Sequence, residues 1–190
     1  PRDADIIFVH SGSVYTNLPV VMEQNQQILG EGVIHPIAVA NLPNARARPF
    51  DPLGTIPLPT ATGGTVLPIL QNTLGDAVTL ADGSTFAGFN INTTTGNGIV
   101  ANGVNGSTVR DVTISGVTAG NGLNFTNNTG TFRIENLNIS GVTDDTTVFD
   151  GGSSTVNWFG GTINSTVGHS VLIQDQSGGV INLADDNGTN

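Results

Sequence analysis

Residues 105–130 read NGSTVRDVTISGVTAGNGLNFTNNTG, and this stretch decides the fold. β-branched residues alternate with polar ones in it, and every apolar run stops at a glycine or an asparagine. Such alternation predicts short β-strands that are separated by turns. The stretch has no apolar stripe at helical spacing, so it does not indicate a long helix.

The stretch is one copy of a repeat. The tetrapeptides FNIN, VTIS, LNIS and GTIN begin at residues 89, 112, 137 and 161, and their isoleucines lie 23, 25 and 24 residues apart. A period of about 24 residues is typical of a solenoid, in which stacked units bury one continuous core. Two more apolar series recur at similar intervals: Val78, Ile99, Leu123, Val148 and Val171, and Phe86, Val109, Phe132, Val156 and Val180. Three series predict three strands per coil.

The polar residues beside the isoleucines form two further series. These are Asn90, Thr113, Asn138 and Thr162 on one side, and Asn92, Ser115, Ser140 and Asn164 on the other. If the isoleucines point inward, both series point outward, because successive side chains of a strand alternate between its faces. We expect a flat outer ladder of neutral groups, which suits a shallow glycan-binding face. The ladder is too mixed for the strict Thr-x-Thr repeat of an ice-binding solenoid.

Composition restricts the partners that the chain can bind. Its 190 residues carry a net charge of −10, with five arginines and no lysine. Nucleic acid and anionic membrane surfaces are therefore disfavoured, because both require a basic face. The chain has no cysteine, and it has no apolar run long enough to cross a bilayer.

A family resemblance lies in residues 5–32, DIIFVHSGSVYTNLPVVMEQNQQILGEG. The segment resembles the opening of right-handed parallel β-helix domains of the pectin-lyase-like superfamily: an apolar strand, a turn with Gly and Tyr, a second strand, and a strand that ends in Gly-x-Gly. The resemblance implies a right-handed parallel β-helix. It leaves function open, because that superfamily includes polysaccharide lyases, glycoside hydrolases, phage tailspikes and adhesins.

Residues 33–68 interrupt the repeat. Seven of the nine prolines fall here, and proline lacks the N–H that a strand ladder needs. We expect an excursion that packs against the side of the solenoid. As an alternative, it forms one wall of a groove in which Arg46 and Arg48 meet an acidic ligand.

The resemblance also suggests a catalytic site. Hydrolases of the polygalacturonase type carry an Asp-Asp pair and, one coil later, a Gly-His-Gly; this chain has Asp144 and Asp145, then His169 between Gly168 and Ser170, 24 residues after Asp145. An inverting hydrolase needs one carboxylic acid and one carboxylate, and Asp150 is a further candidate. The match fails elsewhere, because the upstream Asn-Thr-Asp is replaced by Ala-Gly-Asn at residues 119–121 and the Arg-x-Lys clamp lacks its lysine. The alternative is that these residues are polar turn residues.

A second charged group is predicted where neighbouring coils stack. Arg110 and Asp111 should lie beside Arg133 and Glu135, one coil apart. The cluster is a candidate site for an acidic sugar, with Asp111 and Glu135 as candidate Ca²⁺ ligands, or else a surface ion-pair network worth about 0–1 kcal/mol per pair. Trp158 and Phe159 should face opposite sides of a strand, and we take Trp158 as a candidate sugar-binding ring.

These observations predict one all-β domain over residues 1–190, a fragment of a larger protein, with an N-terminal coil at 5–32, the excursion at 33–68 and regular coils at 69–190. We expect a structural, adhesive or carbohydrate-contacting segment of a secreted or cell-surface bacterial protein, without catalysis and without a required cofactor. The alternative is a polysaccharide-degrading enzyme, either a polygalacturonase-like hydrolase or a calcium-dependent pectate-type lyase. Unpaired strand edges at its ends also predict end-to-end self-association.

Overall fold

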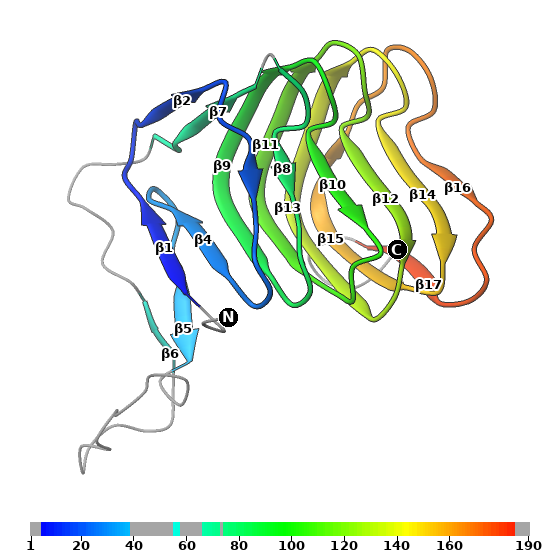
Figure 1. Ribbon diagram of the computed structural model, residues 1–190, viewed down its shortest axis with the longest axis horizontal. Helices are drawn as coiled ribbons and strands as arrows, with labels where there is room; N and C mark the ends of the chain where they lie inside the picture. Colours follow the sequence, from blue (N-terminus) through cyan, green and yellow to red (C-terminus); the bar gives the residue numbers. More distant parts are fainter. Residues whose placement is uncertain (1–4, 39–54, 58–65, 73, 185–190) are drawn as a thin grey trace.

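The chain is a parallel β-solenoid (Figure 1). The structure, a computed structural model, describes residues 5–38, 55–57, 66–72 and 74–184, and none of them is helical. Its first strands are β1 (Ile6–Val9), β2 (Val14–Thr16), β3 (Val20–Val21), β4 (Gln27–Gly30), β5 (Pro36–Ala38), β6 (Thr55–Pro57), β7 (Ile69–Gln71) and β8 (Val78–Thr79). The regular coils contain β9 (Thr85–Thr94), β10 (Ile99–Asn102), β11 (Thr108–Val117), β12 (Leu123–Asn128), β13 (Thr131–Val142), β14 (Thr147–Gly152), β15 (Thr155–Ile163), β16 (Leu172–Gln174) and β17 (Val180–Ala184).

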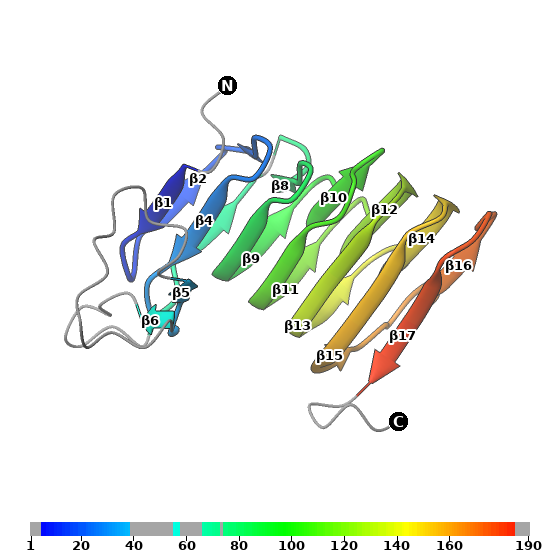
Figure 2. The same cartoon turned by 90° about the horizontal axis from the view of Figure 1, so that it is seen from below.

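Each coil has three sides, as the three series predicted. Residues 85–87 of β9 pair with β4, whereas residues 90–92 of the same strand pair with β7. The first face therefore holds β1, β4, the N-terminal halves of β9, β11, β13 and β15, and β17. The second face holds β2, β7 and the C-terminal halves of the same four long strands. The third face holds β3, β8, β10, β12, β14 and β16, so the solenoid makes six turns. Figure 2 shows the strands stacked side by side along the axis.

A residue at the same register position bends each long strand from the first face to the second, and in β15 Gly161 follows it with a φ of 97°. The four bend residues have positive φ: 78° at Gly88, 54° at Asp111, 49° at Asn136 and 68° at Gly160. Glycine, aspartate and asparagine adopt this left-handed conformation most readily. Asp111 therefore forms the bend of its strand, a role that its charge does not indicate in the sequence.

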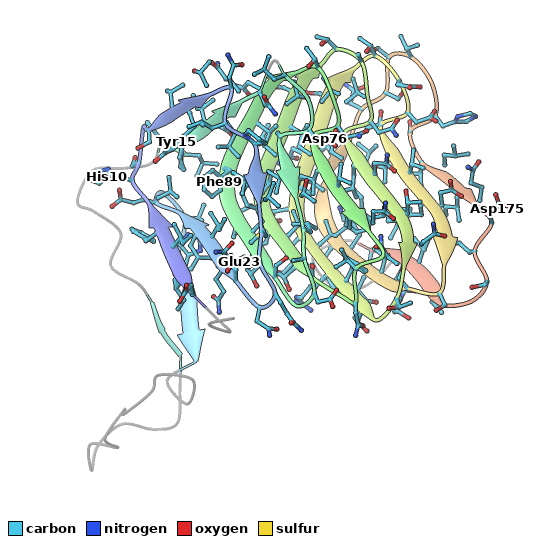
Figure 3. All side chains as sticks on the ribbon, viewed as in Figure 1. His10, Tyr15, Glu23, Asp76, Phe89 and Asp175 are labelled. Atoms are coloured by element: carbon cyan, nitrogen blue, oxygen red, sulfur yellow. The ribbon has the colours of Figure 1, made fainter. Side chains whose placement is uncertain are left out.

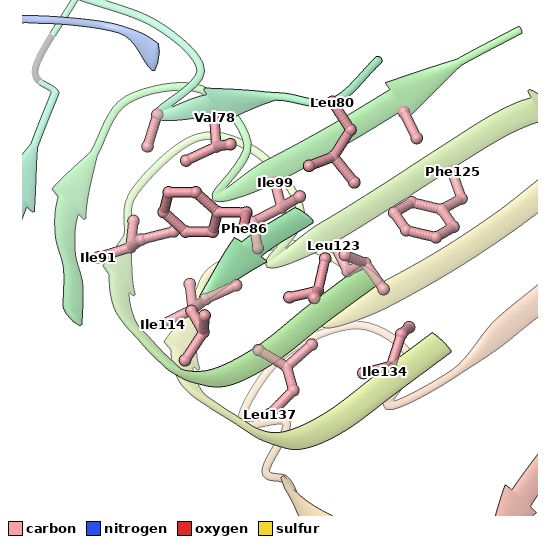
Figure 4. Packing of buried hydrophobic residues seen from close by; sticks show 14 of the residues in the cluster. Val78, Leu80, Phe86, Ile91, Ile99, Ile114, Leu123, Phe125, Ile134 and Leu137 are labelled. Carbon is pink, nitrogen blue, oxygen red and sulfur yellow. The ribbon is translucent and has the colours of Figure 1, made fainter. Parts of the chain in front are cut away.

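The isoleucine series forms a buried row on the second face, as predicted. Ile91, Ile114 and Ile139 pair in register and are at most 1% exposed, and Ile163 continues the row. Figure 4 shows Ile91 and Ile114 pointing into the interior, where Phe86, Ile99 and Leu123 also lie. The core is thus a narrow column of aliphatic and aromatic rows.

Of the other two predicted series, the first contains one error of register and the second contains two. Leu123 pairs with Thr147, not with Val148, so a threonine occupies the inward row where an apolar residue was expected. Val109 pairs with Ile134, whereas Phe132 belongs to the next inward row with Val156. That row continues with Ile181, not with the predicted Val180, which is 55% exposed. Both Phe132 and Ile134 point inward because they are two residues apart, and spacing alone could not distinguish them.

The buried hydroxyl of Thr147 lowers the free energy of unfolding, and a substitution that removes it should raise this free energy. Its side chain is fully buried and its hydroxyl has no hydrogen-bond partner. An unpaired buried hydroxyl costs about 1–3 kcal/mol, and valine has nearly the same shape. Thr147→Val should therefore raise the free energy of unfolding by about 1 kcal/mol, measured by urea denaturation. Thr143→Val is the control, because the exposed Thr143 hydroxyl donates to the Val117 carbonyl oxygen and its loss should bring no gain. A loss of stability in Thr147→Val would contradict the assignment.

The excursion leaves the solenoid after β4. Strands β5 and β6 pair with each other in an antiparallel two-stranded sheet, so this part of the excursion is not a coil. Residues 31–35 lie over the first face: the position that a side chain at Gly88 would occupy is only 2.8 Å from Val33 Cγ2. The start of the excursion therefore lies against the solenoid at Val33.

Candidate functional site

The predicted catalytic residues Asp145 and His169 do meet, at the turn between the second and third faces. The Asp145 Oδ1 atom accepts hydrogen bonds from the His169 backbone N–H at 2.7 Å and from its ring Nδ1 at 2.8 Å. Earlier coils repeat the backbone contact with other residues. Asn97 donates its backbone N–H to Asp76 Oδ1 at 2.6 Å, and Asn121 donates to Asn97 Oδ1 at 2.9 Å. Asp145 and His169 therefore continue a ladder of turn residues.

This role limits what Asp145 can do chemically. The backbone N–H of His169 lowers the pKa of the Asp145 carboxyl below its ordinary value of 3.8. Asp145 is thus a carboxylate at neutral pH and cannot be the protonated acid of an inverting pair. Asp144 is exposed in the same turn, and Asp150 lies on β14 in register with Thr126 and Gln174. The contacts of the described residues do not join these three carboxylates into one site.

The four predicted charges of the second group lie in adjacent coils, with Arg110 in register with Glu135. Their ion pairs nevertheless form within each strand. Arg110 pairs with Asp111 at 2.8 Å, and Arg133 pairs with Glu135. Asp111 also accepts a hydrogen bond of 3.1 Å from Asn136, the next bend residue. Each guanidinium is thus neutralised locally, which weakens its attraction for an acidic sugar.

Arg110 holds the start of the excursion. Its Nη1 donates to the Ile34 carbonyl oxygen at 3.3 Å, and its Nη2 donates to His35 Nδ1 at 2.7 Å. The other ring nitrogen of His35, Nε2, donates to the Gly30 carbonyl oxygen at 2.5 Å. A carbonyl only accepts and a guanidinium only donates, so this geometry requires a neutral His35 with its proton on Nε2. The ring of Phe8 packs edge-on against the imidazole of His35, with 6.1 Å between the ring centres.

The neutral state of His35 predicts a pH dependence of stability. Burial lowers the pKa of His35 below its ordinary value of 6.5, and Arg110 lowers it further, while Gly30 and Asp111 oppose the change. The unfolded chain then binds more protons than the folded one, so this contribution is complete above pH 6.5 and falls as the pH drops toward the folded pKa. Urea denaturation between pH 7.5 and 5 should show this decline, and His35→Gln should reduce it. His10→Gln, which changes a mostly exposed histidine, is the control and should keep it. An equal decline in both variants would contradict the assignment.

Trp158 and Phe159 face opposite sides of β15, as predicted. The outward ring is Phe159, whereas Trp158, the candidate sugar-binding ring, points inward. Trp158 is only 4% exposed and its Nε1 donates to the Gly160 carbonyl oxygen at 2.9 Å. A buried indole cannot stack on a ligand. Phe159 points outward, and the Arg133 guanidinium lies 4.9 Å from its ring centre.

The described residues add no support to the remaining predicted binding and metal sites. Arg46 and Arg48 lie outside the described residues. Among the residues that are described, no group of three or more histidine and acidic side chains could hold a metal ion. Asp111 and Glu135, the candidate Ca²⁺ ligands, are each paired with an arginine instead.

The outward side of the second face is a surface without charge, which we call the neutral face. Its first row is Val14, Ile69, Asn90, Thr113, Asn138 and Thr162, and its second is Thr16, Gln71, Asn92, Ser115 and Ser140. None of the residues on this face is acidic or basic, although the chain has 15 acidic residues. The polar series of the sequence located four of its six coils. It missed β2 and β7 because their residues do not share the Asn, Thr and Ser pattern.

Most of the acidic residues that the structure describes lie outside the strands. Asp76 precedes β8 and Asp175 follows β16, as Figure 3 shows, and Asp82, Asp144 and Asp145 also lie between strands. The charges therefore lie beside the faces more than on them. The described residues form no helix that is long and apolar enough to span a membrane. The chain matches no protein-family model, and no curated protein and no solved structure matches it.

Proposed function

We propose that the chain is a structural, adhesive or carbohydrate-contacting segment of a secreted or cell-surface bacterial protein, with a fold of the pectin-lyase-like kind. The observation that carries the proposal is the neutral face, which is an array of amide and hydroxyl groups that lie in register over several coils. Such groups both donate and accept hydrogen bonds, as the hydroxyls of sugars do. The dispersal of carboxylates over turns also favours a structural segment over an enzyme.

The alternative is a polysaccharide-degrading enzyme that uses the turn at Asp145 and His169. The contact of 2.8 Å between them favours it, because it leaves an exposed imidazole beside a carboxylate. The missing acid partner and the ladder role of Asp145 weigh against it.

Turnover assays separate the two functions. The purified chain is incubated with neutral and with acidic polysaccharides, with and without Ca²⁺, and released reducing ends and unsaturated products are measured. The proposal expects no release above the level of a heat-denatured sample. Cleavage that Asp145→Asn abolishes and Asp144→Asn retains would establish the enzyme and overturn the proposal.

Self-association through the ends of the solenoid is a further part of the proposal. The outer edges of β1 and β17 have no partner strand in the described sheets, and large apolar side chains are exposed at both ends, including Phe8 at 41% and Ile173 at 50%. A hollow of about 260 Å³ that is open to solvent lies between Ile173 on β16 and Val180 on β17. Light scattering should show association that rises with concentration and that Ile173→Lys reduces, because a charge at a strand edge opposes pairing. A monomer at every concentration would contradict this expectation.

A further inference from the structure

The neutral face has the dimensions of an extended binding surface. It crosses six strands, and five strand spacings of about 4.8 Å make it roughly 24 Å long. Its two rows lie two residues apart on each strand, or roughly 6.7 Å. A ligand of similar length would contact several coils at once, so many weak contacts can add up to useful affinity.

The hydrogen bonds within the rows determine which groups remain for a ligand. Ser115 donates its hydroxyl hydrogen to Asn92 Oδ1 at 2.9 Å, and Thr162 donates to Asn138 Oδ1 at 2.9 Å. Each hydroxyl has then used its one hydrogen, and each amide oxygen has used one acceptor site. The amide N–H groups of Asn92 and Asn138 remain as donors, and the hydroxyl oxygens remain as acceptors. The face thus offers donors and acceptors side by side, held in fixed orientation by the ladder.

The borders of the neutral face select against negative charge. The turn on one side carries Asp76, Asp144 and Asp145, whereas at the bend on the other side Asp111 is paired with Arg110. These carboxylates belong to a chain of net charge −10. The net negative charge opposes the binding of an anionic polymer, and salt weakens this effect beyond a screening length of about 8 Å. A cation would find no carboxylate on the face itself.

We infer that the neutral face binds a neutral polysaccharide that lies along the solenoid axis, and that it discriminates against uronate-containing chains. The inference rests on the proposed carbohydrate contact and names its ligand class and its residues. Asn92 and Asn138 donate to sugar oxygens, and Ser115 and Thr162 accept from sugar hydroxyls. Val14 and Ile69 extend the first row with apolar contacts for the C–H groups of a sugar ring.

Affinity electrophoresis in native gels tests the inference. The gels contain a neutral polysaccharide (hydroxyethyl cellulose, galactomannan or dextran) or an anionic one (polygalacturonate or alginate), and the retardation of the chain is measured over a range of concentrations. We expect retardation by at least one neutral polymer, little change with salt, and none by the anionic polymers. Asn138→Asp keeps the shape of the side chain and adds a charge, so it should weaken the affinity about tenfold or more.

Asn124→Asp is the matched control. Asn124 lies on the third face, and its Oδ1 atom accepts a threonine hydroxyl just as Asn138 does, at 3.2 Å from Thr126. Circular dichroism and thermal unfolding confirm that both variants are folded, and Ser140→Asp serves in place of Asn138→Asp if the latter unfolds. If Asn138→Asp reduces the retardation and Asn124→Asp does not, the inference is supported. Retardation that neither variant alters, or that occurs only with anionic polymers, overturns it and leaves the carbohydrate contact standing. No retardation by any polymer overturns both the inference and the carbohydrate contact.

Discussion

Replacing Phe125 by alanine should destabilise the solenoid more than any other change considered. Phe125 is 2% exposed, and its ring packs against Phe132 at 4.7 Å and Phe149 at 5.7 Å between ring centres. Truncation of a buried phenylalanine removes its hydrophobic burial and leaves a cavity, which together cost about 3–5 kcal/mol. The free energy of unfolding from urea denaturation, followed by circular dichroism, should fall by that amount.

Phe159→Ala is the control for this prediction. Phe159 points outward from β15 and has the Arg133 guanidinium over its ring, so its removal should cost about 1 kcal/mol. Equal losses in the two variants would show that the three phenylalanines do not form the centre of the core. A smaller loss at Phe125 than at Phe159 would contradict the register of the third face.

The loss of stability in Phe125→Ala should extend to the neighbouring coils along the solenoid axis. Each coil of a solenoid contacts only its neighbours, so stability is the sum of the coils and the interfaces between them. Phe125 lies on β12, which pairs with β10 on one side and β14 on the other. Hydrogen exchange should therefore increase first in these three strands and least in β4.

The repeat in the sequence was sufficient to predict the fold, because its strongest row is also the most regular. Ile91, Ile114 and Ile139 are flanked by polar residues on both sides, which leaves one possible inward position. The three errors arose where that condition fails, and one of them is the choice of Val180 over its apolar neighbour Ile181. At Thr147 the inward residue is polar and its neighbour Val148 is apolar, and at Phe132 and Ile134 two inward residues compete for one row.

The candidate site was predictable only where it follows the repeat. Asp145 and His169 are 24 residues apart, and this spacing places them in adjacent coils, as the contact confirms. Arg110 and His35 are 75 residues apart, and His35 belongs to the excursion, which has no period. The bend at Asp111 was hidden for another reason, because an aspartate with positive φ looks in the sequence like any other charge.

Replacing Arg110 by methionine should release the start of the excursion. Methionine keeps most of the apolar stem but loses the hydrogen bonds to the Ile34 carbonyl oxygen, Asp111 and His35. The Arg110 side chain is only 15% exposed, so the partners that it leaves behind are poorly hydrated. Breaking such a network costs about 2–3 kcal/mol, which should appear in urea denaturation at pH 7.5.

Arg133→Met makes the same substitution one coil on and separates this effect from the loss of a charge. Arg133 is 56% exposed and pairs with Glu135 at the surface, where an ion pair contributes about 0–1 kcal/mol. Limited proteolysis supplies a second measurement, since cleavage within residues 31–38 should accelerate in Arg110→Met and not in Arg133→Met. In the double variant Arg110→Met with His35→Leu, the two losses should sum to more than the measured loss, because both changes remove the same hydrogen bond. Strict additivity would mean that Arg110 stabilises the bend at Asp111 alone, and that the excursion is held by other contacts.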